Sequence, residues 1–130
     1  QIQAELAGAM DGCDVLLAPT AAVAGLEADG SYLNGITIGA DGVGRERSGT
    51  GHGAGGDAGG VRLEHYWQAH MTMPFNICNR VPIVNVPAGM ADCGIPTGLQ
   101  VIAHPFDDRA AFDVAAAVEQ LMPWTGLAPG

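Results

Sequence analysis

The chain has 130 residues, the size of one domain. Its 14 acidic residues outnumber 5 arginines, lysine is absent, and the net charge is −9. Nucleic-acid binding needs clustered cations and an acidic membrane surface would repel this charge, so neither nucleic acid nor a membrane is an expected partner. Aromatic residues make up only 5% of the chain and glycine fills 20 positions, which predicts poor autonomous stability.

The three cysteines are Cys13, Cys78 and Cys93; they form no CxxC pair and match no metal-ligand spacing. We therefore expect reduced thiols that pack as small apolar side chains in a cytoplasmic protein, with no metal and no cofactor. No apolar run approaches the roughly 20 residues that a membrane span needs.

The start of the chain predicts a helix followed by a strand. Apolar residues at positions 2, 6, 9, 10 and 13 share one helical face, and Gly12 suits the end of that helix. No capping residue precedes it, so we expect a chain cut inside or just before a helix. Residues 14–18 (DVLLA) are apolar on both alternating faces and are closed by Pro19 and Thr20, which predicts an interior strand covered on both sides.

The middle of the chain has little periodicity. Residues 36–38 predict a short strand, and the glycine-rich residues at about 40–60 predict a surface loop or an insertion. This loop contains G-x-G-x-x-G at Gly51, Gly53 and Gly56, but the strand and helix that a dinucleotide site requires do not flank it. Residues 62–79 predict one or two helical turns, broken at Pro74.

Two apolar runs bounded by proline and glycine lie at residues 83–86 (IVNV) and 99–103 (LQVIA), and each predicts a buried strand. The residues ADCGIP between them supply turn chemistry. We expect this pair to belong to a larger sheet whose reactive half lies outside the chain. A last helix is predicted to begin at Asp107 or Asp108. Its apolar stripe consists of Ala111, Val114, Ala115, Val118 and Met122.

The residues supply no self-contained active site. The two serines, Ser31 and Ser48, lie in the irregular region without a GxSxG turn, and a Ser-Lys pair is impossible without lysine. Asp107 and Asp108 suit a helix start better than an acid and base pair. No catalytic residue is therefore assigned.

Four motifs, in order along the chain, carry a resemblance to a known family. They are Pro-Thr at residues 19–20, T-x-P-x-N at 72–76, P-x-x-x-V-P-x-G at 82–89 and G-x-P-x-G-x-Q at 94–100. This order resembles the carboxyl-terminal portion of the amidase signature family, over roughly residues 1–23 and 64–120. Four motifs in the right order are far more specific than any one of them.

The resemblance implies an α/β/α fold, in which helices flank a mixed β-sheet that is incomplete here, and hydrolysis of a carboxylic amide C–N bond. Family members use a serine activated through a cis-peptide serine and a lysine. This chain has neither the lysine nor the signature, so residues 1–130 are expected to be the C-terminal segment of an amidase domain, inactive alone. Its expected partners are the missing amino-terminal part and a small-molecule amide substrate, and a homo-oligomer is left open.

The T-x-P-x-N stretch lies beside the substrate cavity in the family, which implies Thr72, Met73, Phe75 and Asn76 as substrate-binding pocket wall. The alternative is a structural role, in which Thr72 caps a helix, Asn76 bonds locally and Phe75 packs in the core.

The chain departs from the family pattern at one place, and a second function is compatible with the sequence. Arg80 and Val81 lie where some family members have a glycine or one residue fewer, which affects the alignment of the pocket. A different function, that of a non-catalytic interaction protein, would suit a split or decayed amidase half that pairs with a partner through an exposed sheet edge.

Overall fold

The computed structural model describes residues 1–46 and 60–123. The chain divides into two units, each with its own sheet. The first unit comprises Gln1–Thr20, Met71–Gly89 and Pro96–Gly130, and the second comprises Ala21–His70 and Met90–Ile95. Helices and sheets together confirm the α/β class.

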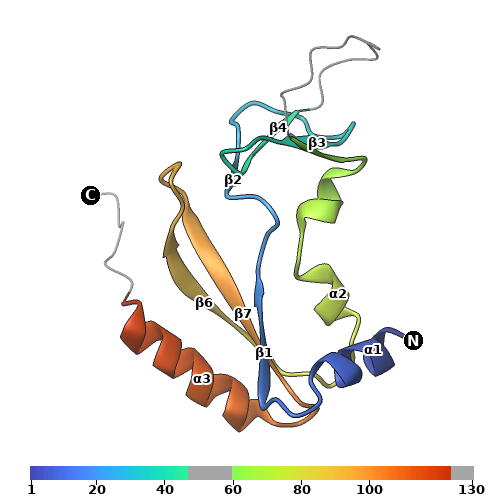
Figure 1. Ribbon diagram of the computed structural model, residues 1–130, viewed down its shortest axis with the longest axis vertical. Coiled ribbons are helices and arrows are strands. Elements are labelled where there is room, and N and C mark those ends of the chain that lie inside the picture. The colour runs from blue at the N-terminus through green and yellow to red at the C-terminus, as the bar shows by residue number, and fades with distance from the viewer. Residues whose placement is uncertain (47–59, 124–130) are drawn as a thin grey trace. The chain divides into compact units, whose positions relative to one another are not determined.

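The first unit is built on a three-stranded sheet in the order β1-β7-β6 (Figure 1). Its strands are β1 (Val15–Pro19), β7 (Pro96–Ala103) and β6 (Ile83–Met90), and β1 runs antiparallel to β7. Its helices are α1 (Ile2–Ala9), α2 (Met73–Asn76) and α3 (Asp108–Leu121). The predicted strand pair, the strand near residues 14–18 and both terminal helices are thus confirmed.

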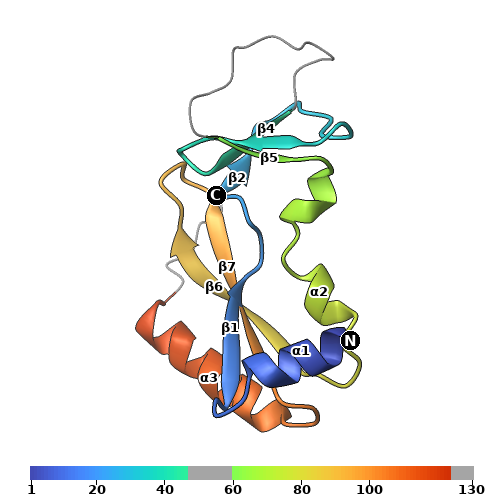
Figure 2. The same ribbon diagram turned by 45° about the vertical axis from the view of Figure 1, so that its right-hand side comes forward.

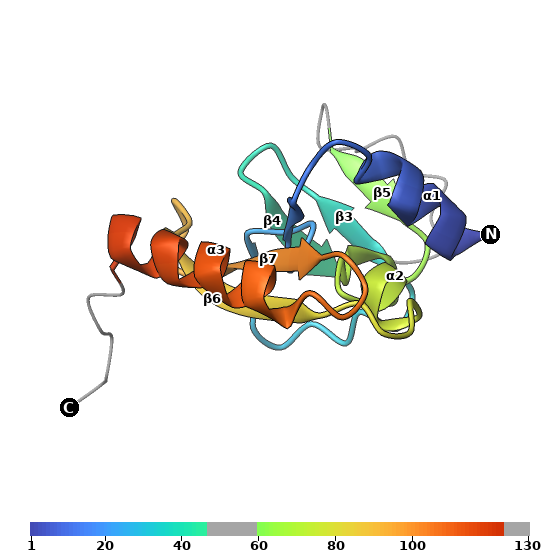
Figure 3. The same ribbon diagram turned by 90° about the horizontal axis from the view of Figure 1, so that it is seen from below.

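Helix α3 packs on β7 and β1 and lies beside the sheet in the views from the side and from below (Figures 1 and 3). Alternate side chains of a strand point to the same face, so one face of the sheet supplies a continuous apolar layer. Val86 and Val101 from the strands meet Ala115 from α3 in a buried cluster. The Asp107 side chain accepts a hydrogen bond from the amide of Ala110 at 3.1 Å, which confirms the predicted helix start.

The interior strand of this sheet is β7. Residues 100–103 are buried on both faces, whereas β1 has β7 on one side only within the described part of the chain. Leu17 of β1 is 49% exposed. The prediction that residues 14–18 form an interior strand covered on both sides is therefore wrong for the described residues. An apolar run indicates a strand with little polar surface, but it does not fix that strand's place in the sheet.

Strand β6 continues through Pro87 to Met90, beyond the end predicted at residue 86. Because β6 lies at the edge of the sheet, the N–H group that proline lacks is not needed for an inner ladder. Pro74 likewise does not break a helix; it lies in the first turn of α2, where proline is tolerated.

The second unit contains a four-stranded mixed sheet in the order β2-β4-β3-β5 (Figure 2). The strands are β2 (Gly25–Leu26), β4 (Val43–Glu46), β3 (Ile36–Ile38) and β5 (Val61–Leu63), followed by the 3-10 helix η1 (Tyr66–Ala69). β2 pairs with β4 in parallel, and β3 pairs antiparallel with β4 and β5. Tyr32, Ile36 and Ala69 form its buried core. The strand predicted at residues 36–38 is confirmed.

Strand β4 corrects the loop predicted at about residues 40–60. Gly44, which broke the sequence pattern, is buried in β4; a Cβ there would lie 2.8 Å from Leu26 Cδ2 and 2.9 Å from Ile36 Cγ2. The glycine therefore permits close packing inside a sheet. Residues 47–59, with the G-x-G-x-x-G pattern, lie outside the described residues.

Candidate functional site

The predicted wall residues all lie on or next to α2. The four-residue helix starts after Thr72, whose carbonyl accepts a hydrogen bond from the amide of Asn76 at 3.1 Å. Thr72 occupies the N-cap position of α2, as the structural alternative expects, but its side chain makes no capping hydrogen bond. Thr72 and Phe75 are half-buried, whereas Met73 and Asn76 are exposed. The helix therefore presents a mixture of apolar and amide surface.

Cys78 follows α2 and is hydrogen-bonded back to it. This side chain is buried, and its thiol donates to the carbonyl of Pro74 at 3.6 Å. The amide of Cys78 donates to the carbonyl of Phe75 at 2.9 Å. Cys78 thus serves as a small packing residue, the role predicted for all three cysteines, whereas Cys13 and Cys93 are exposed and do not pack in this way.

A buried glutamine connects the start of α2 to the sheet. Gln100 of β7 is 1% exposed, and its side-chain amide donates to the carbonyl of Pro19 at 2.8 Å and to that of Met71 at 3.2 Å. One side chain therefore joins the end of β1, the middle of β7 and the residue before Thr72. A buried amide with both donors used holds such a junction in a single arrangement.

Thr20 completes this junction. Its amide donates to the carbonyl of Gly98 at 3.1 Å, and its hydroxyl donates to the same oxygen at 3.2 Å. The amide of Met71 donates to the carbonyl of Thr20 at 3.1 Å. A Cβ on Gly98 would lie 2.8 Å from the Thr20 hydroxyl, so this approach depends on glycine. Residues from the first and last of the four motifs thus meet, up to 81 positions apart in the chain, and they bond to Met71, which directly precedes the T-x-P-x-N motif.

The four wall side chains carry no ionisable group, so they can shape a site and hydrogen-bond to a substrate but cannot act as acid or base. Within residues 1–46 and 60–123, no three His, Cys, Asp or Glu side chains are grouped to hold a metal ion. In the same ranges no helix is long and apolar enough to cross a membrane.

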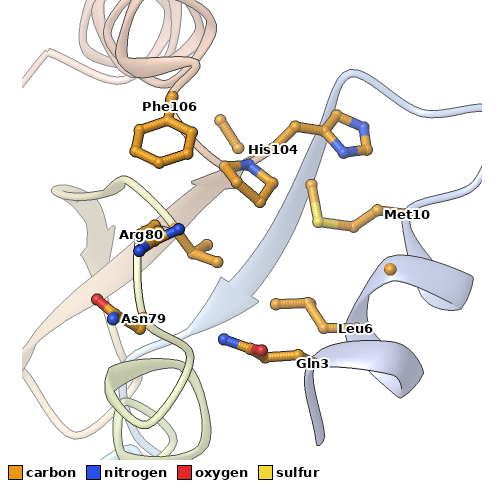
Figure 4. Close-up of a pocket in the computed structure, with 11 residues that line it drawn as sticks. Gln3, Leu6, Met10, Asn79, Arg80, His104 and Phe106 are labelled. Atoms are coloured by element: carbon orange, nitrogen blue, oxygen red, sulfur yellow. The ribbon is translucent and has the colours of Figure 1, made fainter.

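A cavity of about 400 Å³ lies elsewhere in the first unit (Figure 4). Its walls come from α1, the segment at residues 79–81 and the segment at residues 103–106. None of the four predicted wall residues lines it. In the sequence, Arg80 and Val81 differ from the family pattern but show no sign of a cavity, because α1 and residue 104 become their neighbours only when the chain folds.

Over about half of its length the chain is similar to A subunits of glutamyl-tRNA(Gln) amidotransferases. It is 36% identical over 67 residues to the subunit of Thermodesulfovibrio yellowstonii, a match that covers 52% of this chain and 14% of that protein. The subunit of Granulibacter bethesdensis is 41% identical over 54 residues (42% and 11%), and that of an Exiguobacterium species is 44% identical over 58 residues (45% and 12%).

The match therefore spans only 11–14% of the length of these relatives. No family model matches the chain, and no solved structure does. The relatives are amidase signature proteins, so the resemblance of this chain to the amidase signature family is confirmed over about half of its length.

Proposed function

We propose that this chain is the C-terminal segment of an amidase signature hydrolase that cleaves a carboxylic amide C–N bond. The observation that carries the proposal is the junction at Gln100, whose side chain bonds motif residue Pro19 of β1 and Met71, the residue directly before the T-x-P-x-N motif. Such a junction fixes the position of α2, as expected of a segment that supports one side of a site.

The proposed role of Thr72, Met73, Phe75 and Asn76 is to form the substrate-binding wall. Exposed Asn76 offers an amide that can pair with a substrate amide, and Met73 and Phe75 offer apolar surface for its substituent. The serines and the lysine that react in the family would come from the remainder of the domain. The chain alone would then bind substrate weakly and turn none over.

The proposed partners are a small-molecule amide and the polypeptide that carries the reactive residues. The relatives are each one subunit of an amidotransferase, so partner proteins are expected for this chain as well. A cytoplasmic location is part of the proposal, since the three free cysteines suit a reducing compartment.

The purified chain is expected to release no ammonia from simple amides. In a chimera, this chain replaces the homologous C-terminal segment of the Exiguobacterium subunit. The chimera is expected to retain amidotransferase activity within about tenfold of its parent, which corresponds to a loss of at most roughly 1.4 kcal/mol of transition-state stabilisation. The parent truncated before the segment is the control and should be inactive. Turnover by the isolated chain, in a preparation free of contaminating hydrolases, would contradict the proposal.

The second candidate function is a non-catalytic interaction protein. The observation that favours it is the outer edge of β1, which has no strand partner within the described part of the chain, together with exposed Leu17 beside it. This function predicts a folded but inactive chimera and stable association of the chain with the truncated parent.

A further inference from the structure

The cavity beside α1, which has no role in the proposed function, has one apolar wall and another that is more polar. Leu6 of α1 and Met10, which directly follows α1, form one apolar wall, and Gln3 extends it with an amide. Across the cavity lie Asn79, Arg80 and Phe106 (Figure 4). A volume of about 400 Å³ lies within the range of small-molecule sites, and apolar walls with a few polar groups are typical of them.

The backbone on the polar side is held in an unfavourable conformation. Arg80 has φ of +71° and Phe106 has φ of +68°, a region that non-glycine residues seldom adopt. The two residues support each other, because the amide of Phe106 donates to the carbonyl of Arg80 at 3.1 Å. Strained residues of this kind gather at ligand sites, where the strain places particular side chains.

The side chains so placed are a cation and an aromatic ring. The Arg80 guanidinium carbon lies 5.7 Å from the centre of the Phe106 ring, and both residues are exposed. A guanidinium that contacts a ring face through its carbon keeps the N–H groups at its rim available as donors. These groups are suited to a planar anion.

Arg80 also differs from the paired arginines of this acidic chain. Arg45 pairs with Asp41 at 2.7 Å and with Glu27 at 3.0 Å, and its hydrogen bonds lower the pKa of Asp41 to about 2. Arg109 pairs with Asp113 at 3.4 Å. No carboxylate of the described residues pairs with Arg80, and no residue that lines the cavity is acidic.

We propose that this cavity binds a small organic carboxylate with a compact apolar group. The guanidinium of Arg80 takes the carboxylate through paired N–H donors, and the amides of Gln3 and Asn79 supply further donors. The apolar group lies against Leu6, Met10 and the Phe106 ring. His104 is not assigned to carboxylate binding, because its Nε2 lies at hydrogen-bond distance, 2.8 Å, from the carbonyl oxygen of Cys13.

Benzoate and its neutral counterpart benzamide test the site by NMR titration. In the 130-residue chain we expect saturable benzoate shifts at residues 79–81 and 104–106, and binding at least ten times weaker for benzamide. Arg80→Gln should weaken benzoate binding at least tenfold. The matched control Arg62→Gln removes the same charge from an exposed site on β5 and should leave binding unchanged. The same titrations on the chimera described above cover the case in which the chain does not fold alone.

A second variant separates binding from folding. Arg80→Gly removes the guanidinium and relieves the positive φ, so it should raise the midpoint of thermal unfolding while it abolishes the preference for benzoate over benzamide. Equal binding of the two probes, equal effects of Arg80→Gln and Arg62→Gln, or no saturable binding in both the chain and the chimera would overturn the proposal.

Discussion

Replacement of Gln100 by leucine is expected to destabilise the first unit by about 2–4 kcal/mol, because it removes two hydrogen bonds and leaves buried acceptors without a donor. The carbonyls of Pro19 and Met71 lose the Gln100 amide at 2.8 and 3.2 Å, and the apolar side chain that replaces it cannot serve either one. The start of α2 would lose one of the hydrogen bonds that connect it to the sheet. Urea unfolding of the variant measures the change in free energy.

Hydrogen exchange localises this effect. The amide of Met71, bonded to the carbonyl of Thr20, should exchange faster in Gln100→Leu than in the parent. Gln120→Leu is the matched control, since Gln120 is exposed on α3 and should change stability by less than about 0.5 kcal/mol. Equal stability losses for the two variants would mean that Gln100 does not hold the junction.

Replacement of Gly35 by alanine is expected to disrupt the second unit. Gly35 has φ of +101°, and a Cβ there would lie 2.4 Å from the carbonyl oxygen of Leu63 and 2.7 Å from that of Glu64. Both contacts are with backbone, so β5 would have to move away from β3. Ile36, which follows directly, is 1% exposed in the core. A loss of about 3 kcal/mol or more follows from the combined conformational and steric cost.

Gly12→Ala separates the two costs. Gly12 also has a positive φ, of +75°, but a Cβ there would meet nothing within 4 Å. The control should therefore lose only about 1–2 kcal/mol, the ordinary penalty for the left-handed conformation. If urea unfolding gave equal losses for Gly35→Ala and Gly12→Ala, the close approach of β5 to Gly35 would be wrong.

Local signals predicted most elements of the fold. The cap at Asp107 marked the start of α3, and proline and glycine on both sides marked the strand pair β6 and β7. Local sequence signals failed at positions whose role depends on tertiary packing. Gly44 is one of the glycines that predicted a loop, yet its lack of a side chain is what allows Leu26 and Ile36 to pack over β4.

The candidate site was predictable only in part. The T-x-P-x-N motif singled out the candidate wall residues on and next to α2, but it gave no means of finding Gln100 as their support, because its two hydrogen bonds join residues 29 and 81 positions apart. Arg80 is the other example. Its positive φ and its place at a cavity depend on a contact with Phe106, which local sequence does not encode.

The proposed role of α2 as a pocket wall is tested most directly by the substrate preference of the chimera. Phe75→Ala should change the ratio of kcat/KM between a small and a bulky amide by about fivefold or more, since one truncated apolar contact is worth roughly 1–3 kcal/mol in discrimination. Ile77→Ala, at a neighbouring side chain that is 65% exposed, is the control and should leave the ratio unchanged. An unchanged ratio in Phe75→Ala, with Asn76→Ala equally silent, would contradict the assignment of α2 as the wall of the active site.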